Sequence, residues 1–285
     1  MIKQKFRTER VSDRITRICA FSSELMYLVE GEERAALLDT GSGIGFVRPL
    51  IETLTDKPLI VLLTHGHVDH AMGASEFPPE NVYINQQDAY IYGPHSSHEF
   101  RKGGLFLMEG GDLVTEEDFT PVVSIGRYHD LKEGDVFDLG KVSVRIYACP
   151  GHTRGSVVML IPEEKTLLLG DACNSNTFLF EDYSTSVENY LHSIEGLKKK
   201  LGENVSSEGS GEKKAVYDRV LASHGDGVLD CGIIDENIEI CHRIIDGSDD
   251  KVPFVFKGHR GLAALRKSES RHGNIVYNPE HIMDR

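Results

Sequence analysis

Four side chains of the kinds that bind metal ions lie within six residues of one another, directly after an apolar segment. That segment, Leu59–Leu63, is continuously apolar, which is typical of a strand buried on both faces. Alternate residues of an extended segment point the same way, so His65 and His67 can converge on one cation. Asp69 and His70 can face a second cation as the chain turns towards a helix. The motif therefore predicts a metal site, because imidazole and carboxylate groups suit zinc, iron and manganese.

Three further candidate ligands each follow a predicted strand. Taken singly each is weak, because a histidine at a strand end more often only forms hydrogen bonds. Together with the motif they supply enough ligands for a two-metal site. They are His152 after residues 142–148, Asp171 after residues 166–169, and His224 after residues 220–222.

The order of predicted elements favours an α/β domain in which helices cover β-sheets. Strands are predicted at residues 15–21, 25–30, 35–39, 59–63, 82–85, 142–148, 156–161, 166–169 and 220–222. We expect the strand at 220–222 to be the last one in the chain. Helices are predicted at 44–55, from 71 to 76, and at 184–201. The sequence shows no repeat and no linker, so we expect one domain over residues 1–285. Within this domain we expect an insertion at about 89–119, which is either a lid or a surface excursion. We also expect a basic C-terminal segment at about 257–285.

Charge and composition limit the partners and the cellular location that we expect for such a domain. The formal net charge of −14 disfavours large nucleic acids and anionic membranes as partners. No apolar run approaches the ~20 residues that cross a bilayer, and the N-terminus lacks the apolar core of a signal peptide. The 5 cysteines are scattered and form no CxxC pair, so we expect no disulfide framework and a cytoplasmic location.

The chain resembles the metallo-β-lactamase fold superfamily of hydrolases over about residues 15–226. The resemblance rests on HxHxDH at 65–70, PGHT at 150–153, GD at 170–171 and SHGD at 223–226, in that order. It implies an α/β fold, namely an αββα sandwich of two mixed β-sheets flanked by helices, with the site at one edge. It also implies roles for eight residues: His65, His67 and His152 on one metal, Asp69, His70 and His224 on the other, Asp171 as the bridge, and Asp39 supporting the ligands from behind.

A centre of this kind would make the protein a dinuclear metal-dependent hydrolase. Two divalent ions, two aspartates and a hydroxide sum to about +1, which suits an anionic or polarised oxygen. A metal-bound hydroxide would be the nucleophile, and Asp69 could orient it and pass a proton to the leaving group. We expect Zn²⁺, with manganese or iron as alternatives. The favoured substrates are a small ester, thioester or lactone. The alternatives are a phosphodiesterase acting on a small phosphate ester, a mono-iron oxidoreductase like the persulfide dioxygenases, and a metal sensor without turnover.

The chain differs from the sequence patterns of three branches of this superfamily, and these differences refine the expected substrate class. Authentic β-lactamases of the superfamily usually carry Cys or Ser at the bridging position, where this chain has Asp171, so β-lactam hydrolysis is not favoured. The best-known acyl-homoserine lactonases carry a tyrosine three residues after the bridge. This chain has Asn174 there, so such a tyrosine is either missing or comes from elsewhere in the chain, for example Tyr183. The flavodiiron oxidoreductases carry Glu in place of His67.

Substrate contacts are predicted at four positions, each with a plainer alternative. Asn174 could bind substrate or cap its loop, and Tyr183 could replace the missing tyrosine. His259 and Arg260 could bind a carboxylate or phosphate, or belong to a solvated helix or tail. The expected partner is a small-molecule substrate, and a homodimer is left open.

Overall fold

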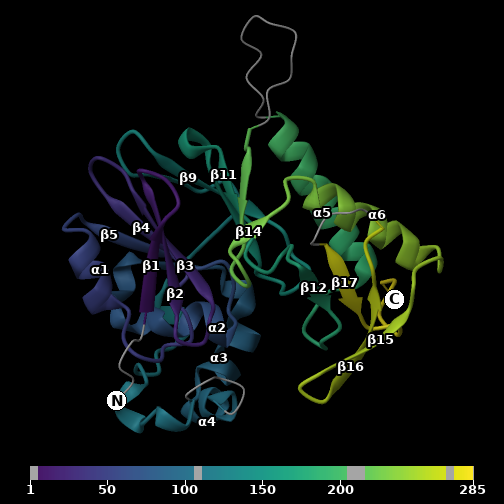
Figure 1. The fold of residues 1–285 in the computed structure, drawn as a ribbon, viewed down its shortest axis with the longest axis horizontal. Coiled ribbons are helices and arrows are strands. Elements are labelled where there is room, and N and C mark those ends of the chain that lie inside the picture. The colour runs from purple at the N-terminus through teal and green to yellow at the C-terminus, as the bar shows by residue number, and fades with distance from the viewer. Residues whose placement is uncertain (1–5, 106–110, 204–215, 268–272, 285) are drawn as a thin grey trace, which may run out of the picture.

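The computed structural model of the protein describes residues 6–105, 111–203, 216–267 and 273–284. Residues 106–110 of the predicted insertion, and 268–272 and 285 of the basic segment, lie outside the described residues. The described chain forms three β-sheets and several helices (Figure 1). None of the described helices is long and apolar enough to cross a bilayer, and all five cysteines are free thiols.

The first sheet has seven strands that follow one another in the order of the chain. Its first four strands pair antiparallel, and the remaining pairs are parallel. The strands are β1 (Phe6–Arg10), β2 (Ile15–Ala20), β3 (Leu25–Glu30), β4 (Ala35–Leu38), β5 (Leu59–Leu62), β6 (Val82–Ile84) and β7 (His129–Asp130).

The second sheet has six strands in the order β14-β13-β11-β10-β9-β8. Only its β11–β13 pair is parallel, so this sheet is mixed, like the first. The strands are β8 (Val136–Asp138), β9 (Ser143–Ala148), β10 (Val157–Ile161), β11 (Thr166–Leu168), β13 (Arg219–Leu221) and β14 (Val228–Leu229).

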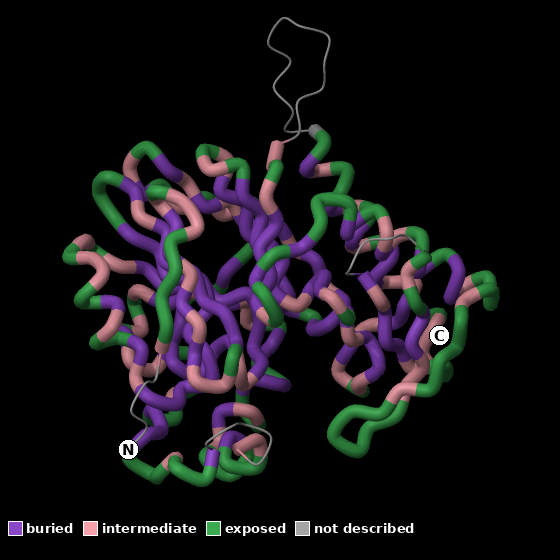
Figure 2. The backbone as a smooth tube through the Cα atoms, in the orientation of Figure 1, coloured by how far each residue is buried: buried purple, intermediate pink, exposed green. Residues whose placement is uncertain are grey.

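The two sheets face each other across an apolar core, and Figure 2 shows that much of the chain in their strands is buried. Tyr27 and Leu62 of the first sheet and Ile146 and Met159 of the second sheet belong to this core. Helices α1 (Arg48–Leu54), α2 (Val68–Ala71) and α3 (Ala89–Ser96) lie on the first sheet's outer face, where α4 (His98–Gly103) follows α3. Helix α5 (Val187–Glu203) covers the second sheet and packs against α6 (Ile233–Ile245). The predicted αββα sandwich is confirmed.

A third sheet, which the sequence did not predict, joins the segment after Asp171 to the C-terminal region. Its strands are β12 (Asn176–Leu179), β15 (Val252–Phe256), β16 (His259–Ala264) and β17 (Asn274–Tyr277), in the order β12-β17-β16-β15. The expectation that residues 220–222 form the last strand is therefore wrong. The alternative of a solvated helix or tail for the basic segment is also wrong, because the described part of that segment contains strands β16 and β17. Ile275 and Tyr277 of β17 pack into the core that also contains α5 and α6.

Candidate metal centre

The seven predicted ligands lie on four segments that follow the ends of strands, and two of them, Asp69 and His70, belong to helix α2. His67 is the last extended residue after β5 (φ −70°, ψ 157°), and α2 begins at the next residue, so Asp69 and His70 turn away from the strand direction. The other ligands come from the second sheet: His152 between β9 and β10, Asp171 after β11, and His224 after β13. The structure thus brings residues from 65 to 224 together at one edge of the sandwich.

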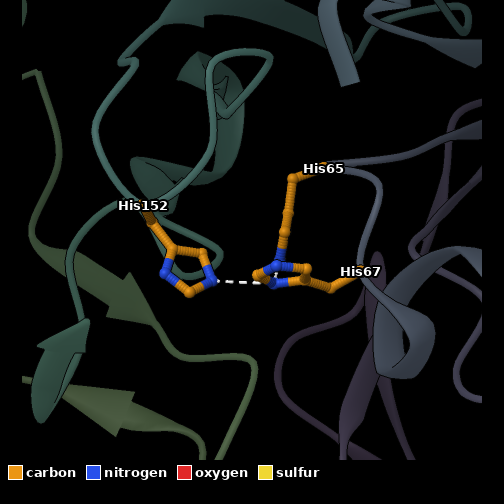
Figure 3. A group of neighbouring side chains, drawn as sticks. All are labelled: His65, His67 and His152. Atoms are coloured by element: carbon orange, nitrogen blue, oxygen red, sulfur yellow. Dashed lines mark hydrogen bonds between the residues drawn. The ribbon is translucent and has the colours of Figure 1, made fainter. Parts of the chain in front are cut away.

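One group consists of three buried histidines, His65, His67 and His152 (Figure 3). The Nδ1 atom of His67 lies 3.0 Å from Nε2 of His65 and 2.8 Å from Nε2 of His152. Three imidazole nitrogens therefore face one another at the spacing expected of ligands around one cation.

A second group consists of Asp69, His70 and His224. The Nε2 atoms of His70 and His224 are 3.2 Å apart, and each lies within 3.9 Å of an oxygen of Asp69. Asp171 lies between the two groups, because its Oδ2 atom is 3.2 Å from Nε2 of His224, 3.6 Å from Nε2 of His70 and 3.7 Å from Nε2 of His152. A single carboxylate oxygen can therefore reach both groups.

The hydrogen bonds behind the ligands decide which ring nitrogens carry hydrogen. His152 Nδ1 donates to the carbonyl of Phe178 at 2.8 Å, and His70 Nδ1 donates to Asp39 at 2.9 Å. Thr64 Oγ1 donates to Asp39, so it accepts from Nδ1 of His65 at 3.0 Å. The Nε2 atoms of His65 and His152 then carry bare lone pairs, whereas the nearby carboxylates favour a proton on Nε2 of His70 when no metal is bound.

Bare lone pairs that face one another repel unless a proton or a metal cation lies between them. Asp39 and its neighbours fix this arrangement, which is the usual way in which outer hydrogen bonds orient metal ligands. His67 Nε2 is buried and has no hydrogen-bond partner among the described residues. The donor set therefore fits divalent cations that prefer nitrogen and oxygen, such as zinc.

Burial and neighbouring charges set the protonation of the site. Burial, together with nearby histidines, lowers the pKa of His65 and His67 well below the usual range. Burial would raise the pKa of Asp171, but His224 and His70 outweigh it and hold that pKa well below its usual value. Burial would likewise lower the pKa of His70, but Asp171, Asp69 and Asp39 outweigh it and raise that pKa. Neutral imidazoles and ionised carboxylates are the forms that bind metals.

Asp88, which the sequence analysis missed, joins two of the ligand loops. Its buried carboxylate accepts from Gly66 N at 2.7 Å, from Thr153 Oγ1 at 2.8 Å and from Gly155 N at 2.6 Å. A Cβ atom on Gly66 or Gly155 would come within 3.0 Å of Asp88. The carboxylate thus holds the HxHxDH loop against the loop of His152.

The centre opens into a cavity of about 550 Å³. Five of the seven candidate ligands line it, namely His67, Asp69, His152, Asp171 and His224. Its walls are largely aromatic and come from three regions of the chain: His95 and Phe100 of the predicted insertion, Phe178 and Tyr183 of the segment after Asp171, and Phe256, Lys257 and His259 of the third sheet.

The four predicted substrate contacts fall in different places. Asn174 is largely occupied within the protein, since it donates to Asp171 at 3.0 Å and accepts from Ser175 N at 2.7 Å. The Tyr183 ring lies 5.0 Å from the His67 ring and borders the cavity, and burial raises the pKa of its phenol. His259 also borders the cavity. Arg260 is exposed and is not among the lining residues.

Comparison with known proteins identifies the class of protein that this fold and this ligand set define. The sequence model of the metallo-beta-lactamase superfamily matches residues 21–206. The chain therefore belongs to the metallo-β-lactamase superfamily.

Curated relatives with named activities are hydrolases of acyl compounds. The chain is 23% identical to acyl-coenzyme A thioesterase MBLAC2 of Homo sapiens over 184 residues, 60% of this chain and 66% of that protein. It is 27% identical to hydroxyacylglutathione hydrolase GloC of Haemophilus influenzae over 161 residues, 55% of this chain and 69% of that protein. An uncharacterized protein of Mycobacterium bovis is 32% identical over 136 residues, 45% of this chain. The chain spans only 54% of that mycobacterial relative.

Solved structures share the fold at low sequence identity. A metallo-beta-lactamase from Pontibacter korlensis matches with a TM-score of 0.55 at 16% identity, covering 82% of this chain and 98% of that chain. The sec-alkylsulfatase Pisa1 from a Pseudomonas species matches with a TM-score of 0.60 at 14% identity, covering 85% of this chain and 43% of that chain.

Proposed function

We propose that the protein is a dinuclear metal-dependent hydrolase that cleaves a small ester, thioester or lactone. The observation that carries this proposal is the position of Asp171 between two groups of candidate ligands, at the lining of an open cavity. A structural metal needs only four ligands in a closed site, whereas this arrangement offers seven side chains and access for a substrate.

The residues around the cavity can divide the work of hydrolysis. When bound, two divalent cations would make water a nucleophile at neutral pH and polarise the acyl oxygen. Asp69 is 38% exposed and borders the cavity, so its carboxylate can orient water and carry a proton to the leaving group. Tyr183 keeps its proton and can donate a hydrogen bond to the acyl oxygen. Asn174 keeps Asp171 in position.

Two observations favour an acyl substrate. The relatives named as a thioesterase and as a hydroxyacylglutathione hydrolase support cleavage of an acyl bond. The aromatic walls formed by Phe100, Phe178 and Phe256 suit the apolar part of such a substrate.

Metal analysis and a substrate panel test the proposal. We expect about two zinc or manganese ions per chain, and turnover of p-nitrophenyl esters, thioesters or lactones. Asp171→Ala should lower kcat/KM at least about 100-fold, because the carboxylate reaches both groups of ligands. Asp138→Ala is the matched control, since Asp138 is exposed and only caps a turn at Gly140 N.

Three results would contradict the proposal. Full activity of the Asp171→Ala protein would refute the bridging role. Turnover confined to bis-p-nitrophenyl phosphate would favour a phosphodiesterase. A single iron with oxygen uptake on a persulfide would favour the oxidoreductase alternative.

A further inference from the structure

The turn between β15 and β16 places a lysine at the cavity, beyond the residues that the family model matches. Lys257 and Gly258 form this two-residue turn, with φ values of 50° and 88°. Phe256 and His259 are paired on either side of it. Two successive residues in the left-handed region suit a tight hairpin. In Figure 1 the hairpin reaches from the third sheet towards α3 and α4, and Figure 2 shows that its tip is exposed.

Contacts with the segment after Asp171 hold this hairpin in place. Strand β17 pairs with β12 on one side and with β16 on the other. The Phe254 ring lies 5.6 Å from the ring of Phe178 and 5.8 Å from that of Phe180. His259 Nδ1 donates to Glu181 at 2.8 Å. The backbone of the turn is therefore fixed relative to Phe178, whose carbonyl orients His152.

The charge of Lys257 is not neutralised within the described chain. None of the described carboxylates lies within 4.0 Å of its Nζ atom, and Glu181, the acid on the adjoining wall, is paired with His259. The Nζ atom lies 5.2 Å from the centre of the Phe256 ring. Such a contact with an aromatic face orients an ammonium group but leaves its charge in place.

We propose that Lys257 binds an anionic group of the substrate, a carboxylate or a phosphate, which is separate from the acyl bond that is cleaved. This inference rests on the proposed hydrolase function and names its substrate class: an ester or thioester with an apolar part and a negatively charged end. The apolar part lies against Phe100, Phe178 and Phe256, while the acyl bond faces Asp69 and Asp171. An ammonium group is a good point-charge partner for either anion.

Matched substrates test the proposal on the metal-loaded protein. One set varies the acyl end: p-nitrophenyl hexanoate, the mono-p-nitrophenyl ester of adipic acid, and p-nitrophenyl 6-phosphonohexanoate. A second set varies the leaving group: hexanoyl thioesters of propanethiol and of 3-mercaptopropionate. We expect a preference for the anionic member of at least one set, and the phosphonate-to-carboxylate ratio separates the two anions.

Substitution of the lysine should remove this preference. Lys257→Ala should raise KM for the anionic substrate about three- to tenfold and leave kcat unchanged, because the contact is remote from the acyl bond. Lys257→Arg should retain the preference. Lys141→Ala is the matched control, since Lys141 is exposed, has the same left-handed backbone (φ 60°) and lies outside the cavity. Equal kcat/KM values within both sets, or a preference that survives Lys257→Ala, would overturn the proposal.

Calorimetric titration tests anion binding by Lys257 independently of whether the protein is a hydrolase. The probes are 4-phenylbutyrate and its neutral counterpart 4-phenylbutanol, titrated into metal-loaded wild type and Lys257→Glu. Weaker binding of the carboxylate alone in the variant supports the proposal even if no ester is turned over. Equal affinity for the carboxylate in both proteins overturns it even if esters are hydrolysed.

Discussion

Asp88 shows how a residue outside the metal-binding set can control it. Its two carboxylate oxygens accept from the backbones of Gly66 and Gly155 and from the hydroxyl of Thr153. Burial raises the pKa of this carboxyl, while the three donors oppose the rise. The aspartate therefore fixes the separation between the loop of His65 and His67 and the loop that carries His152.

We expect Asp88→Asn to weaken both the fold and the metal site. The amide has only one oxygen, so its NH₂ group must face one of the present donors. The free energy of unfolding of the metal-free protein should fall by about 1–3 kcal/mol. Zinc affinity should fall about 10- to 100-fold, which is the usual effect of losing an outer positioning contact. Urea unfolding and competition with a chromophoric chelator measure the two quantities.

Asp118→Asn is the matched control for this experiment. Asp118 is also buried and accepts from the backbone and hydroxyl of Thr115, but it is not among the residues that approach the ligands. This variant should lose stability and keep its zinc affinity. Unchanged zinc affinity in Asp88→Asn would show that Asp88 is only structural.

At the level of single residues, the sequence predicts what lies close together in the chain. His65, His67, Asp69 and His70 form a local motif whose chemistry is readable without a structure. Asp88 belongs to no motif, because its partners are backbone amides 22 and 67 residues away. Such a contact depends on how loops from both sheets meet, which periodicity and spacing do not report.

Among the secondary-structure elements, the β15–β16 hairpin is the one whose placement most affects the cavity. Phe254→Ala should raise KM several-fold at constant kcat, because the hairpin loses its ring contacts with Phe178 and Phe180 while the metal ligands stay in place. Steady-state kinetics with an ester substrate measures the change. Val255→Ala, at an adjacent side chain that is 65% exposed, should behave like wild type. Equal KM values in the two variants would contradict a supporting role for the aromatic contacts.

Two groups of elements were missed for different reasons. Helix α6 has a readable apolar face, with Ile233, Ile240, Cys241 and Ile244 buried at helical spacing, and could have been predicted. Strands β15 and β16 carry many exposed residues, and the third sheet depends on the pairing of β17 with β12, which is about 100 residues earlier. Long-range pairing of this kind is fixed by tertiary packing more than by local propensity.

For the molecule as a whole, metal binding should contribute to stability. Ligands that bind only the folded state stabilise it by about 4 kcal/mol at 1,000 times their Kd. Removal of the metals with a chelator should therefore lower Tm by about 5–15 °C for a chain of this size. The crowded ring nitrogens of His65, His67 and His152, which a cation would hold together, are the physical reason. Differential scanning calorimetry measures the shift.

The controls for this prediction use the same protein. Zinc added back should restore Tm, whereas magnesium should not, because it prefers oxygen ligands. Far-UV circular dichroism at 25 °C should not change on chelation, since the apolar core between the sheets does not involve the metals. An identical Tm with and without the chelator would contradict a bound metal.

The layered architecture came from the resemblance, because the order of predicted elements did not distinguish a sandwich from an open sheet. The strands of the first two sheets were largely readable, since their apolar runs are short and bounded by turns. How the sheets face each other depends on which side chains meet across the core, such as Tyr27 and Ile146, and no local pattern reports that.

The spread of the ligands along the chain also bears on how the protein is made. Both ligand groups draw on residues from the HxHxDH loop, but one needs His152 and the other needs His224. A growing polypeptide that has been synthesised only as far as the end of the first sheet contains the ligands of the HxHxDH motif and lacks the others. Occupation of both groups by metal would therefore be completed late in biosynthesis, once β13 has been translated and has paired with β11.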